Sequence, residues 1–266
     1  MPVSELISRY DQLILDLDGC VWIGDEPTAG AVEAIAALRE ARKGVAFVTN
    51  NPRLPSEDYV AKLWGLGVKA SLGDVVTVGA AMQHLLAETR SGRTAFVIGT
   101  AALVHHVAAA GLKPLNGTDR ASQAEVVVVG GTDRLSYDDL REATLAVRGG
   151  ADFLATSRDP TYPMPDGMWP GGGALLAAVE VASERQAAIV GKPEPQLLLT
   201  ALERLGGGDT LVIGDRLDAD VAAAGRAGLD AALVLTGGAS REDAEAAREP
   251  APVAIAASLA ELVDGA

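Results

Sequence analysis

The sequence has few of the residues on which several classes of protein depend. Its 266 residues include one cysteine, Cys20, so a disulfide within the chain is impossible and a cysteine-rich zinc site is excluded. Aromatic residues make up 4% of the chain, and there are three histidines. No run of lysines and arginines stands out, and the net charge is −14. The positive patch typical of nucleic-acid binding is missing, so we expect no nucleic-acid partner.

Long hydrophobic runs are also missing. No apolar run approaches the roughly 18 residues that are needed to span a bilayer. The first twelve residues, MPVSELISRYDQ, contain no apolar signal region. We therefore expect a cytoplasmic protein with no membrane partner. Because the chain is negative, an anionic ligand would need local compensation from a metal, a lysine or backbone N–H groups.

Apolar runs of strand length alternate with helical patterns along almost the whole chain. Most of these runs are continuously apolar, which is typical of strands that helices cover on both faces. The alternation predicts an α/β fold with a doubly wound parallel sheet. The predicted strands are 13–17, 45–49, 75–78, 95–99, 125–130, 152–156, 187–191, 210–215 and 231–236.

Nine strands are many for one doubly wound sheet, and two breaks indicate a division of the chain. The polar segment SGR at 91–93 is one break. The segment 158–173 holds four prolines and four glycines, so it predicts a long structured loop rather than a strand or helix. We predict a core built from 1–88 plus 180–266, and an inserted α/β cap domain at 89–179.

Polar side chains follow the predicted core strands at their carboxyl ends, which is where open α/β sheets bind ligands. Carboxylates at this density repel one another unless a cation lies among them. Oxygen ligands without histidine or cysteine indicate Mg²⁺, and a metal, a lysine and a Thr/Asn pair can together hold a phosphate. The residues are Asp16, Asp18 and Gly19 after the first strand, Thr49, Asn50 and Asn51 after the second, Lys192 and Pro193 after 187–191, and Asp215, Asp218 and Asp220 after TLVIG.

The segments DLDGC, TNN, GKP and GDRLDAD, in this order, resemble the four motifs of the haloacid dehalogenase (HAD) superfamily. The subgroup that they most resemble is the class IIA phosphatases, which carry a large α/β cap. This subgroup includes p-nitrophenylphosphatase-like proteins, glycerol-3-phosphate phosphatases and pyridoxal phosphatases. The resemblance covers nearly the whole chain, because ADFLATSRDPTYP and PGGGALLAAVE resemble the stretch by which that cap returns to the core.

The resemblance implies a role for each motif residue. Asp16 would be the nucleophile that attacks phosphorus, and also a Mg²⁺ ligand. Asp18 would be the general acid and then the general base, with its backbone carbonyl on Mg²⁺. Asp215 would be the third protein ligand of the metal, and Asp220 would hold these ligands in place.

The substrate's phosphoryl group would be held by a second set of motif residues. Thr49 and the backbone around Asn50 and Asn51 would bind it, and Lys192 would neutralise charge on both Asp16 and the phosphate. Asp218 is expected to be a solvated or capping residue without a chemical role.

Three positions depart from the usual pattern of the subgroup, and none of them removes a catalytic group. Cys20 stands where Thr or Val is common, Ala219 replaces a frequent Thr, and Ser157 stands where Asn is frequent. Cys20 is expected to be a small packing residue, and a redox-sensitive thiol is the alternative.

The loop 158–173 has two interpretations. Its large side chains could pack the cap onto the core, or some could line the entrance and meet the leaving group of the substrate. Tyr162, Met164, Met168 and Trp169 belong to the first interpretation, and Arg158, Asp159 and Tyr162 to the second.

The sequence therefore predicts a Mg²⁺-dependent phosphatase that hydrolyses a small phosphomonoester through an aspartyl-phosphate. Glycerol phosphate, pyridoxal phosphate, a sugar phosphate and a nucleotide remain open as substrates. The alternatives are a non-enzymatic phosphometabolite-binding protein on the same fold and a dehalogenase. Dehalogenation is disfavoured because it needs neither Asp18 nor Asp215. The expected partners are the phosphorylated metabolite and a second copy of the chain, bound through the cap.

Overall fold

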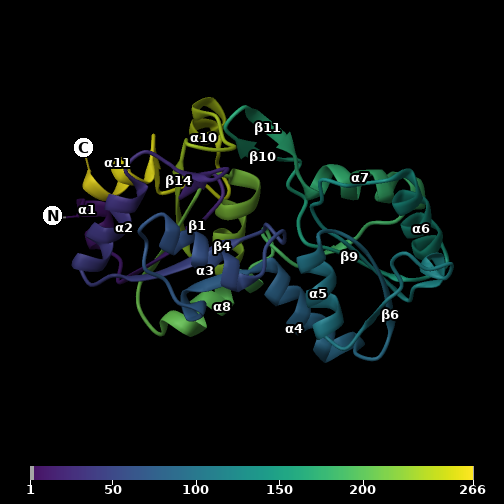
Figure 1. The fold of residues 1–266 in the computed structure, drawn as a ribbon. Helices are drawn as coiled ribbons and strands as arrows, with labels where there is room; N and C mark the ends of the chain where they lie inside the picture. Colours follow the sequence, from purple (N-terminus) through teal and green to yellow (C-terminus); the bar gives the residue numbers. More distant parts are fainter. Residues whose placement is uncertain (1–2, 266) are drawn as a thin grey trace.

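The computed structural model describes residues 3–265 and shows two lobes, each built on a parallel sheet (Figure 1). The core sheet has the strand order β15-β14-β13-β1-β4-β5, and the cap sheet has the order β12-β9-β8-β6-β7. All neighbouring strands in both sheets are parallel, so the predicted α/β class is confirmed. The core strands are β1 (Gln12–Asp16), β4 (Gly44–Thr49), β5 (Val75–Thr77), β13 (Thr210–Gly214), β14 (Asp230–Val234) and β15 (Ala254–Ala256). The cap strands are β6 (Thr94–Ile98), β7 (Lys113–Pro114), β8 (Val126–Val129), β9 (Asp152–Ala155) and β12 (Ala188–Ile189).

Helices cover both faces of each sheet, as continuous apolar strands require. One face of the core sheet packs on α2 (Ala31–Glu40), α3 (Ser56–Gly65) and α11 (Leu259–Asp264). The far face of the cap sheet packs on α6 (Tyr137–Arg148) and α7 (Gly172–Ser183). The remaining helices are α1 (Glu5–Ser8), α4 (Val78–Arg90), α5 (Ala101–Ala109), α8 (Gln196–Leu205), α9 (Ala222–Ala227) and α10 (Arg241–Ala246), with short turns at Leu72–Asp74, Ala121–Gln123 and Leu217–Val221.

One apolar layer joins the two lobes. Met82 of α4 and Val107 of α5 belong to the same buried cluster as Ile14 in the core sheet and Val97 in the cap sheet. Figure 1 shows α4 and α5 lying between the lobes. Each of these four side chains is at most 3% exposed, so burial in this layer holds the lobes together.

The segment 187–191 differs from its prediction. It was expected to be a core strand, but its β12 (Ala188–Ile189) pairs with β9 at the edge of the cap sheet. Lys192 therefore reaches the site from the cap sheet and not from the core sheet. The division into 1–88 plus 180–266 and 89–179 stays a prediction, and the pairing of β12 favours a second boundary beyond Ile189.

The predicted loop 158–173 is also different. It contains an antiparallel hairpin, β10 (Thr161–Met164) and β11 (Gly167–Pro170), and α7 begins at Gly172. The hairpin was not predicted because prolines are rare inside the strands of a sheet. Its two strands pair only with each other and belong to neither large sheet.

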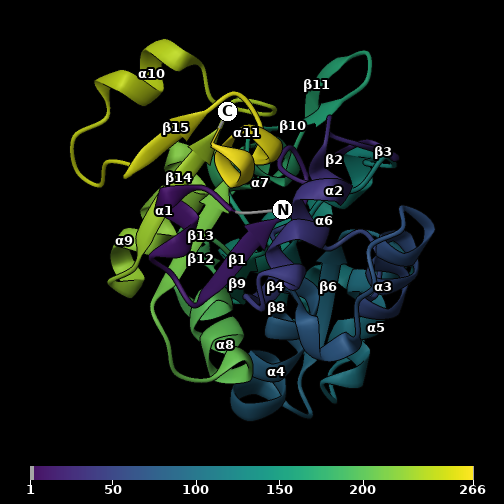
Figure 2. The same cartoon turned by 90° about the vertical axis from the view of Figure 1, so that its left-hand side faces the viewer.

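The β10–β11 hairpin reaches across to the core lobe (Figure 2). It approaches a second small hairpin, β2 (Trp22–Ile23) and β3 (Glu26–Pro27). A Cβ atom built on Gly24 would lie 2.9 Å from Pro165 Cδ, so the hairpin tips are in contact. Among residues 3–265, no helix is both long and apolar enough to cross a membrane.

Candidate active site

Three neighbouring core strands deliver polar side chains to one edge of the sheet. Asp16 ends β1, Thr49 ends β4, and Asp215 directly follows β13, with β1 between the other two strands. Because the carboxyl ends of parallel strands share an edge, the side chains meet there, as predicted. Asp16, Thr49 and Asp215 are all buried.

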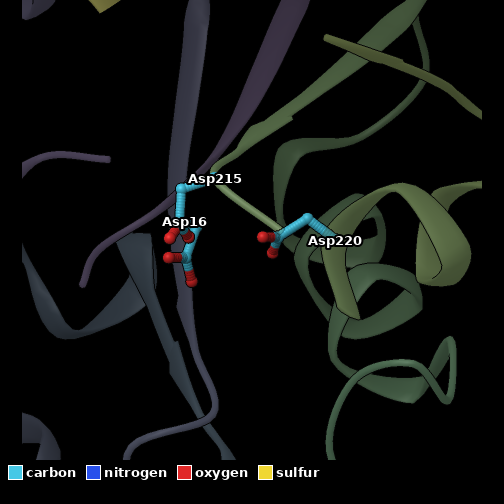
Figure 3. Close-up of side chains that lie close together, drawn as sticks. All are labelled: Asp16, Asp215 and Asp220. Atoms are coloured by element: carbon cyan, nitrogen blue, oxygen red, sulfur yellow. The ribbon is translucent and has the colours of Figure 1, made fainter. Parts of the chain in front are cut away.

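Asp16, Asp215 and Asp220 form a compact group of carboxylates (Figure 3). One oxygen atom from each of them lies within 4.8 Å of the others. Asp220 comes from the turn Leu217–Val221 and points back toward the other two. Its carboxylate thus belongs to the group of three that could hold a metal ion, although the resemblance gave it only a supporting role.

Burial changes the pKa of two of these acids, Asp215 and Asp16. Burial raises the pKa of Asp215 to about 7, and the neighbouring Asp220 adds to this effect. Burial also raises the pKa of Asp16 well above its usual value, which Lys192 only partly opposes. Bringing buried carboxylates together is costly unless positive charge compensates them.

The donor set fits a hard divalent cation. Asp215 Oδ2 accepts a hydrogen bond from the backbone N–H of Gly238 (2.5 Å), whereas its buried Oδ1 has no hydrogen-bond partner within residues 3–265. A buried carboxylate oxygen without a donor needs another partner, and a cation coordinated by the carboxylates would supply one. Asp18 contributes no side-chain atom to the carboxylate group of the described chain, and ligation through its carbonyl stays a prediction.

Glycines make room for Asp215. A Cβ atom on Gly19 would lie 2.5 Å from Asp215 Oδ2, and one on Gly237 would lie 2.0 Å from it. Gly19 also has a φ of +91°, a conformation that residues with a side chain rarely adopt. The glycine in DLDGC is thus required both for the turn after β1 and for the position of Asp215.

Lys192 lies between two of the carboxylates. Its Nζ is 2.5 Å from Asp16 Oδ1 and 2.5 Å from Asp220 Oδ1, and the lysine is 3% exposed. Burial alone would lower the pKa of Lys192, but the two carboxylates raise it above its usual value. The lysine is therefore a fixed positive charge at the site, as its predicted role requires.

The side chain of Asn50 holds the backbone of Lys192. Asn50 Oδ1 accepts from the Lys192 N–H (2.7 Å), and Asn50 Nδ2 donates to the Lys192 carbonyl (2.9 Å). A Cβ atom on Gly191 would lie 2.4 Å from Asn50 Oδ1, so the residue before the lysine has to be small. The side-chain amide of Asn50 is already hydrogen-bonded to Lys192. If Asn50 binds the phosphate, it would therefore do so through its backbone.

Asp18 is not part of this group of three carboxylates, but it lines the same pocket between the lobes. Its carboxylate accepts hydrogen bonds from Trp22 Nε1 (3.1 Å) and Thr49 Oγ1 (3.1 Å), and Asn51 Nδ2 lies 3.4 Å away. The two aspartates of DLD thus face different parts of the site. Asp16 faces the lysine, and Asp18 faces the space in which a leaving group would lie.

The pocket is lined from both lobes. Asp159 and Tyr162 line it, as the second interpretation of the loop predicts. Arg158 is not among the lining residues, because its guanidinium forms an ion pair with Glu180 (2.7 Å), so the second interpretation does not hold for Arg158. The lining residues from the loops around the cap sheet and the β10–β11 hairpin are Gly131, Thr156, Ser157, Asp159, Thr161, Tyr162, Pro163, Gly171 and Gly172.

The first interpretation, that the large side chains of the loop pack the cap onto the core, is wrong for part of the hairpin. Met168 and Trp169 are 46% and 41% exposed, so they do not bury the cap against the core. Trp169 contacts the edge of the Tyr162 ring, with centroids 6.4 Å apart. Met164 lies near Gly24, as cap-to-core packing predicts.

Two arginines at the site were not singled out from the sequence. Arg53 lines the pocket, and its guanidinium lies 4.8 Å from the Tyr162 ring centroid. Arg216 also lines the pocket and follows the buried Asp215. The signals available in the sequence were the position of Arg53 two residues after TNN and that of Arg216 inside GDRLDAD.

Comparison with known proteins decides the family. The profile described as haloacid dehalogenase-like hydrolase matches residues 13–113, and one described as HAD-hydrolase-like matches residues 189–262. The chain is 32% identical to the acid sugar phosphatase of Staphylococcus saprophyticus over 90% of its length and 92% of that protein. It belongs to the haloacid dehalogenase-like hydrolases.

Another member of the HAD family is more similar in sequence. The D-glycerol 3-phosphate phosphatase of Mycobacterium tuberculosis is 38% identical over 91% of this chain and 67% of that protein. The crystal structure of the M. tuberculosis glycerol phosphate phosphatase in complex with magnesium superimposes with a TM-score of 0.86, covering 98% of this chain and 78% of that one. The resemblance to HAD phosphatases with an inserted cap is thereby confirmed.

Proposed function

We propose that this HAD protein is a Mg²⁺-dependent phosphatase that hydrolyses a small phosphomonoester. The observation that carries the proposal is the pairing of Asp16 with the buried Lys192 at the base of a pocket that both lobes line. A bound Mg²⁺ would supply the positive charge that neutralises the carboxylates and polarises the phosphate oxygens. Asp16, Asp215 and Asp220 are the side chains that would hold it.

The first chemical step uses the two aspartates of DLD. An oxygen of Asp16 attacks phosphorus while the bond from phosphorus to the leaving oxygen breaks. Asp18 donates a proton to that leaving oxygen, which departs as an alcohol. Lys192 stays charged throughout and balances the charge on Asp16 and on the phosphoryl oxygens.

The second step releases phosphate. Asp18, now ionised, takes a proton from a water molecule whose oxygen attacks the phosphorus of the aspartyl-phosphate. The bond from phosphorus to Asp16 breaks, which restores the carboxylate. Thr49 and Asn51 hold Asp18 through both steps, because their side chains lie 3.1 and 3.4 Å from its Oδ2.

A polyol phosphate suits the pocket best among the candidate substrates. Its cap-side lining includes Thr161 and Tyr162, whose side chains carry hydroxyl groups. Such groups pair with the hydroxyls of glycerol or of a sugar. The names of the M. tuberculosis and S. saprophyticus relatives support the same class.

The test is phosphate release from glycerol 3-phosphate, a hexose 6-phosphate, pyridoxal 5′-phosphate and a nucleoside monophosphate, with and without Mg²⁺. Asp16→Asn should abolish release. Asp209→Asn is the matched control, because Asp209 is exposed at the opposite end of β13. Absence of release by a folded, Mg²⁺-bound protein would favour the phosphometabolite-binding alternative.

We also propose a cytoplasmic location and a homodimer formed through the cap. The exposed apolar side chains of Tyr137, Leu145 and Val181 on α6 and α7 support the cap as the contact surface. Sedimentation analysis of Tyr137→Ser tests the dimer, and a dimer of unchanged stability would contradict this surface.

A further inference from the structure

Asp159 connects the loop after β9 of the cap sheet with two loops of the core sheet. Its Oδ2 accepts a hydrogen bond from Asn50 Nδ2 (3.0 Å), and its Oδ1 lies 3.5 Å from Arg216 Nε. Its side chain is 20% exposed, so water reaches the carboxylate poorly. Such a contact between a carboxylate and two core residues restrains how the loop and the core lie relative to each other.

The first connection leads to the backbone of the catalytic lysine. The amide of Asn50 has two N–H groups, of which one goes to the Lys192 carbonyl and the other to Asp159. Its oxygen accepts from the Lys192 N–H. An ionised carboxylate can only accept, so Asp159 helps to fix which way the amide faces. Asn50 then holds the main chain of Lys192 from a fixed direction.

The second connection leads to the ammonium group of the same lysine. Arg216 donates its backbone N–H to Asp220 Oδ2 (3.1 Å), and Asp220 Oδ1 contacts Lys192 Nζ. The guanidinium of Arg216 is also paired with Asp218 (2.8 Å), which is exposed. Both paths from Asp159 therefore end on Lys192, one at its backbone and one at its charged end.

We propose that Asp159 is a positioning residue that couples the loop after β9 to the orientation of Lys192. The inference rests on the proposed phosphatase function and adds a residue to it. Asp159 acts through Asn50 and Arg216 and does not act by binding the leaving group. A lysine displaced from the phosphoryl group stabilises the transition state less, whichever alcohol is leaving.

A contact with the leaving group would behave differently. Asp159 lines the pocket, so it could accept a hydrogen bond from a hydroxyl of glycerol. In that case its loss would harm glycerol 3-phosphate, which has such hydroxyls, and would spare p-nitrophenyl phosphate, which has none. The two roles are separated by whether the loss depends on the leaving group.

The experiment measures kcat and KM for both substrates with wild type, Asp159→Asn and Asp159→Ala. For both variants we expect kcat to fall by about tenfold or more, by the same factor for the two substrates, with KM changing less than about threefold. A loss confined to glycerol 3-phosphate, or confined to KM, would overturn the proposal. So would an unchanged kcat in both variants.

Asp152→Asn is the matched control. Asp152 lies at the other end of β9 and is ion-paired with Arg90 and Arg93, away from the pocket lining. Its substitution removes a paired carboxylate from the strand that leads into the loop of Asp159, so we expect some loss of thermal stability and an unchanged kcat. An equal loss of kcat in Asp152→Asn would mean that any damage to the cap lowers activity, and this would overturn the specific role of Asp159.

A binding measurement separates this inference from the proposed function. If wild type hydrolyses neither substrate, the phosphatase proposal fails, but the coupling to Lys192 can still be measured. Calorimetry with inorganic phosphate and Mg²⁺ should then show weaker phosphate binding for Asp159→Asn than for wild type and Asp152→Asn. Equal phosphate affinity in all three proteins would contradict the coupling.

Discussion

The ammonium nitrogen of Lys192 lies 2.5 Å from Asp16 Oδ1, although the two residues are 176 positions apart in the chain. Lys192 follows the edge strand of the cap sheet, and Asp16 ends a central strand of the core sheet. The nucleophile and its counter-charge are thus supplied by different sheets. Any change in how the two lobes lie against each other alters this contact.

Replacing the lysine should destabilise the protein in a pH-dependent way. Lys192→Met leaves Asp16 and Asp220 buried without their cation, which costs about 3–5 kcal/mol for a broken buried pair. We expect the loss in the free energy of unfolding to be larger at pH 8 than at pH 5, because at low pH the unpaired carboxylates can take up protons. Urea denaturation at both pH values measures it.

Lys113→Met is the control for this loss, because Lys113 is exposed on the edge strand β7 of the cap sheet. Its effect should stay below about 0.5 kcal/mol at both pH values. A loss for Lys192→Met that does not depend on pH would argue against unpaired carboxylates as its cause.

The metal-free protein should lose stability as the pH rises from about 4 to 7. The unfolded chain releases the proton of Asp215 near pH 3.8, whereas the folded protein keeps it until about pH 7. The folded state binds more protons in this window, so this group's contribution to the free energy of unfolding falls with rising pH. Asp215→Asn removes that contribution. Denaturation of the metal-free variant and of wild type at pH 5 and pH 8 measures the change in the free energy of unfolding.

Mg²⁺ should reverse the loss, because it binds the ionised carboxylate. We expect Mg²⁺ to raise the Tm of wild type more at pH 8 than at pH 5.5, and to leave the Tm of Asp215→Asn nearly unchanged. Thermal denaturation with Mg²⁺ or EDTA checks this. A Tm shift of equal size at both pH values would contradict the link between Asp215 and the metal.

Gly19→Ala should damage the site beyond its effect on the backbone. The substitution places a Cβ against Asp215 and forces alanine into a φ of +91°. The backbone term costs roughly 1–2 kcal/mol. Displacement of Asp215 should also abolish the Mg²⁺-induced rise in Tm.

Gly92→Ala is the control that measures the cost of a positive φ alone, without a contact to Asp215. Gly92 has a φ of +85°, and a Cβ there would meet no described atom within 4 Å. This variant should lose similar stability but keep its response to Mg²⁺. If Gly19→Ala also kept the response, the close approach to Asp215 would not matter for the metal.

Trp22 should support catalysis through its indole N–H. Trp22→Phe keeps a ring for stacking on Tyr59 (centroids 6.3 Å apart) but removes the donor to Asp18. A hydrogen bond worth about 0.5–1.5 kcal/mol predicts a fall in kcat of about twofold to 13-fold. Trp64→Phe is the control, because Trp64 is exposed and donates to the Ala70 carbonyl. A larger fall for Trp64→Phe would exclude this role for Trp22.

The sequence by itself determined nine of the eleven strands in the two large sheets of the described chain, and the chemical identity of the site. The short edge strands β7 and β15 were not predicted. Continuous apolar runs located each of the nine predicted strands, because burial between helices requires them. Parallel strands share one carboxyl edge, so the residues after 13–17, 45–49 and 210–215 could be expected to meet. Ser136 and Asp139 also form a local capping box that needs no tertiary contact.

The tertiary structure decided what depends on distant contacts. It placed 187–191 in the cap sheet, folded 161–170 into a hairpin and turned Arg158 away from the pocket to Glu180. The contact of Asp159 with Arg216 likewise joins loops of the two lobes. A strand's local sequence is equally suited to either sheet, and an ion pair depends on packing between segments far apart in the chain. These features therefore depend on contacts between segments that are separated in the chain, which the local sequence does not encode.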